Sequence, residues 1–386
     1  MARTVAFDCR YFLGDRPCVW HKRDGALCKC DHFDPVQERV LIVKLDAMGD
    51  VLRTTALLPA LSEAHPGAAI TWITRPESKP LLENNPYLHE VIAYGPDVLV
   101  RLAVQTFHRV INLDAGKLSA GLTALAQGAR KDGYVLHADG HIVATNPAAR
   151  RWLELGVFDD LKKENSKTYQ SAMGEILGLP SGPGRYVLEL RQEEQDSARE
   201  HLCRLGIDPD APIVGLNTGA GERWALKQWR LDGFEELIVR LHRDLGVQVV
   251  LLGGRGERDR HEHFVRTASV PVFDSGNDNS VRHFSALVSL CDVVVAGDTL
   301  ALHVALATRR RTIVLFGPTS HAEIELYGLG EKVIPDMKCL VCYKGTCDFV
   351  PNCMDLISVD MVFDAVRRQL QLGGRTAVSQ AFAVSV

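Results

Sequence analysis

A short apolar segment that passes directly into a helical pattern is the strongest constraint on the fold of this chain. Residues 40–45 form an apolar run of strand length, and a turn at Met48-Gly49 follows. Beyond the turn, apolar residues recur at helical spacing, namely Val51, Leu52, Leu57, Leu58 and Leu61. A change from strand to helix across a glycine predicts one strand-turn-helix unit of a Rossmann-like domain, which binds ligands at the carboxyl ends of its strands.

Asp50 lies directly after this turn, at the start of the predicted helix. An aspartate at such a position often only caps the unpaired N–H groups of the helix. A carboxylate at the ligand-binding edge of a sheet can also act in catalysis. This segment alone leaves both interpretations open.

A second polar loop follows a predicted strand in the segment VVVAGDTLALHVALATRRRTIVLFGPTS. The loop contains Asp298 and Thr299, and His303 lies one helical turn beyond Thr299, on the same helix face. The next predicted strand, 312–316, ends in another polar loop, Gly317-Pro318-Thr319. Both loops are therefore expected at the same edge of a second sheet.

Strands and helices alternate along the chain, which predicts an α/β protein with two parallel, doubly wound sheets. Strands are expected near 40–45, 69–74, 90–94, 109–114 and 131–137, and then near 213–217, 248–253, 271–274, 293–297 and 312–316. Helices of the second half are expected near 193–205, 232–245, 281–291 and 299–308. The expected domains are a cysteine-rich extension (1–36), two Rossmann-like domains (37–185 and 193–370) and a flexible tail (371–386), with a Gly- and Pro-containing connector at 181–192.

Five segments occur in a fixed order along the chain: KLDAMGDVLRTT, NTGAGERWALKQWRLDGFEEL, LLGGRGERD, GDTLALH and FGPT. Together they resemble glycosyltransferase family 9, the bacterial heptosyltransferases of the lipopolysaccharide core, over residues 38–370. The resemblance implies a GT-B fold, in which two Rossmann-like domains face each other across a cleft. The first half would bind the acceptor and the second half the nucleotide-sugar donor. The implied reaction is inverting transfer of a sugar, with heptose from ADP-heptose as the first candidate, to a lipopolysaccharide-core or other glycan or lipid-linked acceptor.

Inverting transfer needs a base that takes the proton of the acceptor hydroxyl. Asp50 is the candidate base. A helix amino terminus stabilises a carboxylate and so weakens it as a base, whereas exclusion of water from a closed cleft would strengthen it again.

The departing diphosphate needs positive groups and N–H donors. Asn217 and the glycine-containing loop after it offer backbone N–H groups, and the resemblance assigns phosphate contacts to Thr218 and Lys227. It also assigns Glu257 to the ribose, although an acidic residue at a helix start is equally favoured by the helix dipole. A solvated lysine is the alternative for Lys227.

The loop at Asp298 and Thr299 would place a helix amino terminus at the diphosphate and a carboxylate at the hydroxyls of the donor sugar. His303 would either bond a phosphate or pack beneath the loop. Leu300 stands where many members of the family carry glycine, which restricts how closely the backbone can approach a phosphate. No acidic pair has the spacing of a divalent-cation site, and the resemblance also implies catalysis without a metal or cofactor.

Eight of the ten cysteines fall into two groups. The first group, Cys9, Cys18, Cys28 and Cys30, lies with His21 and His32 in an extension that typical heptosyltransferases lack. A cytosolic chain with this pattern favours a structural zinc or iron–sulfur cluster over disulfides, with reduced thiols as the alternative. The second group is Cys339, Cys342, Cys347 and Cys353, for which a disulfide, a metal site and free thiols remain open.

Composition limits the remaining possibilities. A net charge of −4 on 386 residues argues against nucleic acid as a partner. The first residues lack the apolar core of a signal peptide, and no apolar stretch is long enough to span a bilayer, so a cytoplasmic protein is expected. A lipid-linked acceptor would add peripheral association with the inner membrane face.

Two functions of different classes fit these residues. One is the glycosyltransferase described above. The other is a metal-bearing binding or assembly protein that keeps a nucleotide-sugar-binding scaffold without turnover. Retention of Asp50, Lys227 and Asp298 together favours the enzyme. A sugar-nucleotide epimerase of the same architecture fits the motifs less well.

Overall fold

The computed structural model describes residues 4–179 and 184–374, apart from the side chains of residues 222–224. Residues 1–3 of the predicted extension, 180–183 of the predicted connector, and the predicted tail from residue 375 onward lie outside the described residues. The chain divides into two compact units. The first unit comprises Met1–Ala47, Ala56–Leu153 and Ser171–Gly184, and the second comprises Met48–Thr55, Glu154–Gln170 and Arg185–Val386.

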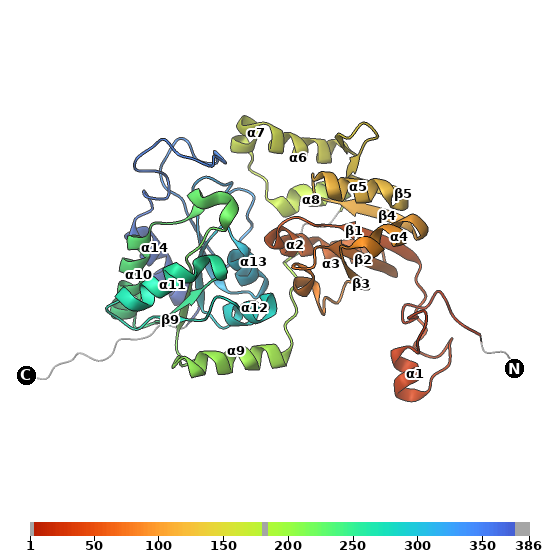
Figure 1. Ribbon diagram of the computed structural model, residues 1–386, viewed down its shortest axis with the longest axis horizontal. Helices are drawn as coiled ribbons and strands as arrows, with labels where there is room; N and C mark the ends of the chain where they lie inside the picture. The colour runs from red at the N-terminus through yellow and green to blue at the C-terminus, as the bar shows by residue number, and fades with distance from the viewer. Residues whose placement is uncertain (1–3, 180–183, 375–386) are drawn as a thin grey trace, which may run out of the picture. The chain divides into compact units, whose positions relative to one another are not determined.

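The first unit contains a six-stranded sheet in the order β3-β2-β1-β4-β5-β6 (Figure 1). Strands β1 to β5 are parallel and β6 is antiparallel to β5. The strands are β1 (Glu38–Val43), β2 (Ala68–Thr74), β3 (Glu90–Ala93), β4 (Thr106–Asn112), β5 (Gln127–Leu136) and β6 (Ile142–Ala144). The helices that lie wholly or partly in this unit are α1 (Val19–Asp24), α3 (Leu58–Ala64), α4 (Pro96–Val104), α5 (Lys117–Leu125), α6 (Pro147–Val157) and α8 (Tyr169–Leu177), with 3-10 turns η1 (Thr55–Leu57) and η2 (Lys79–Leu82).

The second unit repeats this architecture with a parallel sheet in the order β12-β11-β10-β7-β8-β9. Its strands are β7 (Ile213–Asn217), β8 (Gln248–Leu252), β9 (Phe273–Asp274), β10 (Val293–Gly297), β11 (Arg311–Leu315) and β12 (Gly330–Val333). Its helices are α2 (Met48–Thr54), α7 (Asp159–Glu164), α9 (Gln192–Arg204), α10 (Leu231–Leu245), α11 (Arg258–Thr267), α12 (Val281–Ser289), α13 (Leu300–Ala307) and α14 (Val359–Leu372), with 3-10 turns η3 (Glu222–Lys227) and η4 (Arg255–Glu257).

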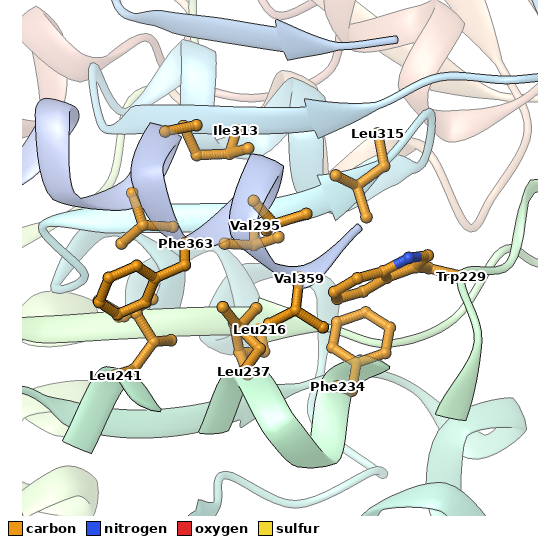
Figure 2. Packing of buried hydrophobic residues seen from close by; sticks show 14 of the residues in the cluster. Leu216, Trp229, Phe234, Leu237, Leu241, Val295, Ile313, Leu315, Val359 and Phe363 are labelled. Atoms are coloured by element: carbon orange, nitrogen blue, oxygen red, sulfur yellow. The ribbon is translucent and has the colours of Figure 1, made fainter. Parts of the chain in front are cut away.

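The core of the second unit shows why these segments fold as they do. Strand β10 reads Val-Val-Val-Ala-Gly and is buried along its whole length, as expected for a central parallel strand covered on both faces. Helix α10 buries Phe234, Leu237, Ile238 and Leu241, which recur at helical spacing. Figure 2 shows Phe234, Leu237 and Leu241 between α10, α14 and the sheet, with Trp229, Leu216 and Phe363 in the same cluster.

The expected α/β class with two parallel sheets is confirmed. Several elements were not expected, among them β6, β12 and α11. The division into units also differs from the expected boundaries, because residues 48–55 and 154–170 belong to the second unit although both fall within 37–185. The helix that carries Asp50 is therefore part of the same compact unit as the predicted donor residues. Within residues 4–179 and 184–374, no helix has both the length and the apolar character needed to cross a bilayer.

Candidate active site

Helix α2 packs directly against helix α13 in the second unit. A Cβ atom added to Gly49 would lie 2.5 Å from the Cδ2 atom of His303, so only glycine allows this close approach. His303 is buried, and its Nδ1 atom lies 3.4 Å from the hydroxyl of Tyr186. The two predicted loop segments therefore meet through a glycine on one helix and an imidazole on the other.

Asp50 is the third residue of α2 and is paired with Arg53 one turn later, at 2.8 Å. The side chain of Arg53 is 13% exposed, and its guanidinium lies over the ring of Tyr169, 3.7 Å from the centroid. A second carboxylate, that of Glu323, lies 3.9 Å from Arg53. The arginine therefore shares its charge between Asp50 and Glu323.

Burial shifts the pKa values of two groups around this arginine. It raises the pKa of Glu323 above its usual range, and the carboxylates of Asp298 and Asp50 act in the same direction, against the opposing effect of Arg53. Burial also lowers the pKa of His303 to about 4, with Arg53 acting in the same direction. His303 is therefore neutral above about pH 5 and contributes a hydrogen-bonding imidazole, not a cation.

Lys227 supplies a positive charge to the site and is held by Asp298. The ammonium of Lys227 donates to the backbone carbonyl of Asp298 at 2.5 Å and lies 3.5 Å from its carboxylate. The side chain of Lys227 is 11% exposed, which contradicts the alternative of a freely solvated lysine. The ammonium is thus held at the loop that begins α13.

The amino terminus of α13 lacks a side-chain cap. Thr299 occupies the N-cap position, but its hydroxyl donates to the side-chain carbonyl of Asn217 at 2.8 Å. The Oγ1 atom of Thr218 is buried and has no hydrogen-bond partner within the described residues. Unsatisfied helix N–H groups, an unpartnered hydroxyl and an ammonium are the groups that bind phosphate oxygens.

Glu257 lies beside the loop after β7. Its carboxylate fills the space over Gly219, where an added Cβ would come within 1.8 Å of Oε1. Its Oε2 atom also accepts the N–H of Gly254 at 2.7 Å. The structure thus places Glu257 at the predicted loop, and one of its oxygens caps the local 3-10 turn.

All eight residues predicted for catalysis and donor binding lie in the second unit. Sequence reasoning assigned no role to Arg53, Tyr169, Tyr186 or Glu323. Arg53 lies within the KLDAMGDVLRTT segment, three residues after Asp50, and that spacing was an available signal.

The four cysteines of the extension line one cavity of about 630 Å³, together with His21 and His32. All four are free thiols. Among the described residues, no three of their sulfur atoms lie mutually within 4.8 Å. The four thiols therefore surround one cavity, but their sulfur atoms do not have the close spacing of a tetrahedral metal site.

The second cysteine group, Cys339, Cys342, Cys347 and Cys353, also consists of free thiols. Cys353 is buried, and burial raises the pKa of its thiol to about 11, with Cys342, Cys339 and Cys347 acting in the same direction. The four side chains are therefore neighbours in the fold, as their spacing in the sequence suggests.

Solved structures share this architecture. One is an ADP-heptose lipopolysaccharide heptosyltransferase II from E. coli. The alignment includes 87% of this chain and 99% of that chain, with a TM-score of 0.66 and 18% identity. Another is TibC from enterotoxigenic E. coli, a dodecameric iron-containing heptosyltransferase solved with ADP-D-β-D-heptose. The alignment includes 88% of this chain and 77% of that chain, with a TM-score of 0.55 and 13% identity. The fold is the GT-B fold of glycosyltransferases, as expected.

Sequence comparison identifies the glycosyltransferase family. Lipopolysaccharide heptosyltransferase 1 of Pseudomonas aeruginosa is 25% identical over 355 residues, which are 86% of this chain and 92% of that protein. The profile of glycosyltransferase family 9 (heptosyltransferase) matches residues 100–351. This chain belongs to glycosyltransferase family 9. The expected family and the expected enzyme class are both confirmed.

Proposed function

We propose that this enzyme transfers heptose from ADP-heptose to an acceptor of the lipopolysaccharide core, with Asp50 as general base. The observation that carries the proposal is the packing of α2 on α13, which places Asp50 in the same compact unit as Lys227, Asp298 and the uncapped helix terminus. Support for the donor and pathway comes from the relatives, which are named as ADP-heptose and lipopolysaccharide heptosyltransferases.

In the proposed reaction, the acceptor hydroxyl gives its proton to Asp50 as its oxygen bonds the anomeric carbon of the donor. The bond from that carbon to the diphosphate oxygen breaks on the opposite face, and ADP leaves. Arg53 holds the Asp50 carboxylate in place through their 2.8 Å contact. Because Arg53 also interacts with Glu323, its charge is only partly available to weaken Asp50 as a base.

The negative charge that develops on ADP would be neutralised without a metal. Lys227, the N–H groups at the start of α13 and the hydroxyl of Thr218 supply the donors. Asp298 and Thr299 would bind sugar hydroxyls, and the uncharged imidazole of His303 would donate a hydrogen bond. Glu257 would accept from the ribose with the carboxylate oxygen that does not cap the turn.

The acceptor and the cellular location follow from the same proposal. A lipid-linked lipopolysaccharide core is assembled at the inner membrane face, so the enzyme would be cytoplasmic and associate with that surface peripherally. The first unit would bind the acceptor at the carboxyl edge of its sheet.

Thermal unfolding with a panel of nucleotides tests the donor. At about 100 times its dissociation constant, a ligand stabilises the native protein by about 2.7 kcal/mol. We expect ADP-heptose and ADP to raise the melting temperature, and UDP or GDP sugars to leave it unchanged. A shift with another sugar nucleotide would keep the enzyme class and change the donor. No shift with ADP-heptose, ADP or any other nucleotide would contradict the proposed donor site.

Replacing Lys227 with methionine should weaken ADP binding. A hydrogen bond to a charged group contributes about 1.5–3 kcal/mol, which corresponds to a roughly 10–150-fold higher dissociation constant for ADP. Isothermal titration calorimetry measures this dissociation constant. Lys131→Met is the matched control, because Lys131 also donates to a backbone carbonyl, that of Ala124 at 2.8 Å, but lies in the first unit. Unchanged ADP affinity in Lys227→Met would remove Lys227 from the donor site.

The extension is proposed to bind one structural zinc ion or iron–sulfur cluster through Cys9, Cys18, Cys28 and Cys30. Support comes from the shared cavity and from the iron content of TibC. Such a group would draw the four thiolates together and stabilise a segment with little apolar content.

Protein purified without chelator and without air should contain zinc or iron in stoichiometric amount by elemental analysis. A Cys18→Ser/Cys30→Ser variant should lose it, whereas Cys203→Ser, which removes an exposed thiol of α9, should retain it. Metal retained in the double variant but lost on replacing Cys339 and Cys342 would move the site to the second group. Metal-free wild-type protein would refute both assignments.

A further inference from the structure

A hairpin in the first unit gathers three potential metal ligands. Strands β5 and β6 pair Leu136 with Ile142, and the chain between them reads His-Ala-Asp-Gly-His. The turn is closed by a hydrogen bond from the N–H of His137 to the carbonyl of His141 at 2.8 Å. Gly140 has a φ of 89°, a conformation that glycine adopts easily. The backbone therefore fixes the two histidines side by side with Asp139 between them.

The side chains of this cluster converge on one point. The Nδ1 atom of His137 lies 3.0 Å from the Oδ1 atom of Asp139, and the Nδ1 atom of His141 contacts the same oxygen. The two imidazole rings are stacked with centroids 4.9 Å apart. Among the described residues, this is the one group of three or more His, Cys, Asp or Glu side chains whose ligand atoms all lie within 4.8 Å of one another.

We propose that His137, Asp139 and His141 bind a divalent transition-metal ion, with Zn²⁺ as the probe. Nitrogen and carboxylate ligands lie about 2.0–2.2 Å from zinc, so neighbouring ligand atoms in a tetrahedral or octahedral shell are about 3.0–3.5 Å apart. The 3.0 Å separation at His137 is within this range. Two imidazoles and one carboxylate are also a donor set that zinc, nickel and iron accept in proteins.

The position of the hairpin would allow a bound metal ion to take an exchangeable ligand from solvent or from a bound molecule. Strand β5 is parallel to β4, so its carboxyl end lies at the sheet edge where open α/β sheets bind ligands. All three side chains are more than half exposed, at 56%, 58% and 62%, so an ion can enter from solvent. Three protein ligands leave at least one coordination position for water or for an oxygen of a bound molecule.

Comparison of variants of the full chain tests the site. After chelator treatment, equilibrium dialysis against Zn²⁺ should show one equivalent more in the wild type than in a His137→Gln/His141→Gln variant. His108→Gln, which removes an exposed imidazole from β4 of the same unit, should bind as the wild type does. The ten cysteines are common to all three proteins, so thiol-bound zinc cancels in the comparison. Equal stoichiometry and affinity in the wild type and the double variant would overturn the proposal.

Nuclear magnetic resonance of the imidazole nitrogens provides a second readout that does not depend on stoichiometry. Zn²⁺ should shift the Nδ1 resonances of His137 and His141 and leave those of His108 in place. The alternative to a metal is a pair of hydrogen bonds from the two imidazoles to Asp139. In that case, the resonances of His137 and His141 would not respond to Zn²⁺, and the metal site would be excluded.

Discussion

Replacing Asp50 with asparagine is expected to lower kcat for heptose transfer by about 10²–10⁴-fold, the usual contribution of a general base. Asparagine keeps the size of the side chain and can still contact Arg53, but it cannot take the acceptor proton. Because the donor groups are unchanged, the dissociation constant for ADP-heptose should stay within about twofold, in keeping with the small effect of substitutions that spare the binding contacts. Release of ADP in the presence of a heptose-deficient lipopolysaccharide core measures kcat.

Asp159→Asn is the matched control for this substitution. Asp159 also lies at a helix start and pairs with a cation three residues later, Lys162 at 3.3 Å, but its side chain is 68% exposed. Its loss should leave transfer unchanged. Wild-type turnover in Asp50→Asn would show that Asp50 is not the base and serves only as the partner of Arg53.

Replacing Asp114 with alanine is expected to destabilise the first unit by about 3–5 kcal/mol, the usual effect of leaving a buried charge without its partner. The carboxylate of Asp114 pairs with Lys44, and both side chains are about 3–4% exposed. It also accepts the N–H groups of Leu45 at 2.6 Å and Asp46 at 3.1 Å. Chemical denaturation followed by fluorescence gives the change in the free energy of unfolding.

An exposed ion pair provides the comparison for Asp114→Ala. Glu90 pairs with Arg101 on the same unit, and both side chains are more than a third exposed. Glu90→Ala should therefore cost only about 0.2–1 kcal/mol. If Asp114→Ala cost no more than Glu90→Ala, the buried pair would not contribute to the stability of this unit.

The sequence predicted the parts of the fold and site that depend on local pattern. Buried parallel strands such as β10 are continuous apolar runs, and a glycine-containing loop that carries Asp298 follows β10. Strand β12 was missed because Gly330–Val333 has only one buried residue and no apolar run. Its place in the sheet is set by pairing with β11, which a single-sequence pattern does not reveal.

The polar surroundings of Asp50 were missed for a similar reason. Tyr169 and Glu323 are far from Asp50 in sequence, and the N–H of Tyr169 donates to the carbonyl of Glu323 at 2.9 Å. Neither residue belongs to a recognisable motif. Their role around Arg53 follows from tertiary packing alone.

The close approach at Gly49 has a further consequence for how the enzyme would work through a catalytic cycle. Helix α2 is joined by the chain to β1 of the first unit, yet it packs with α13 in the second. If the proposed roles hold, the spacing between Asp50 and the donor residues is fixed inside the second unit, by the packing of α2 on α13. A Cβ atom at position 49 would force His303 or α2 to shift, and would therefore alter that spacing.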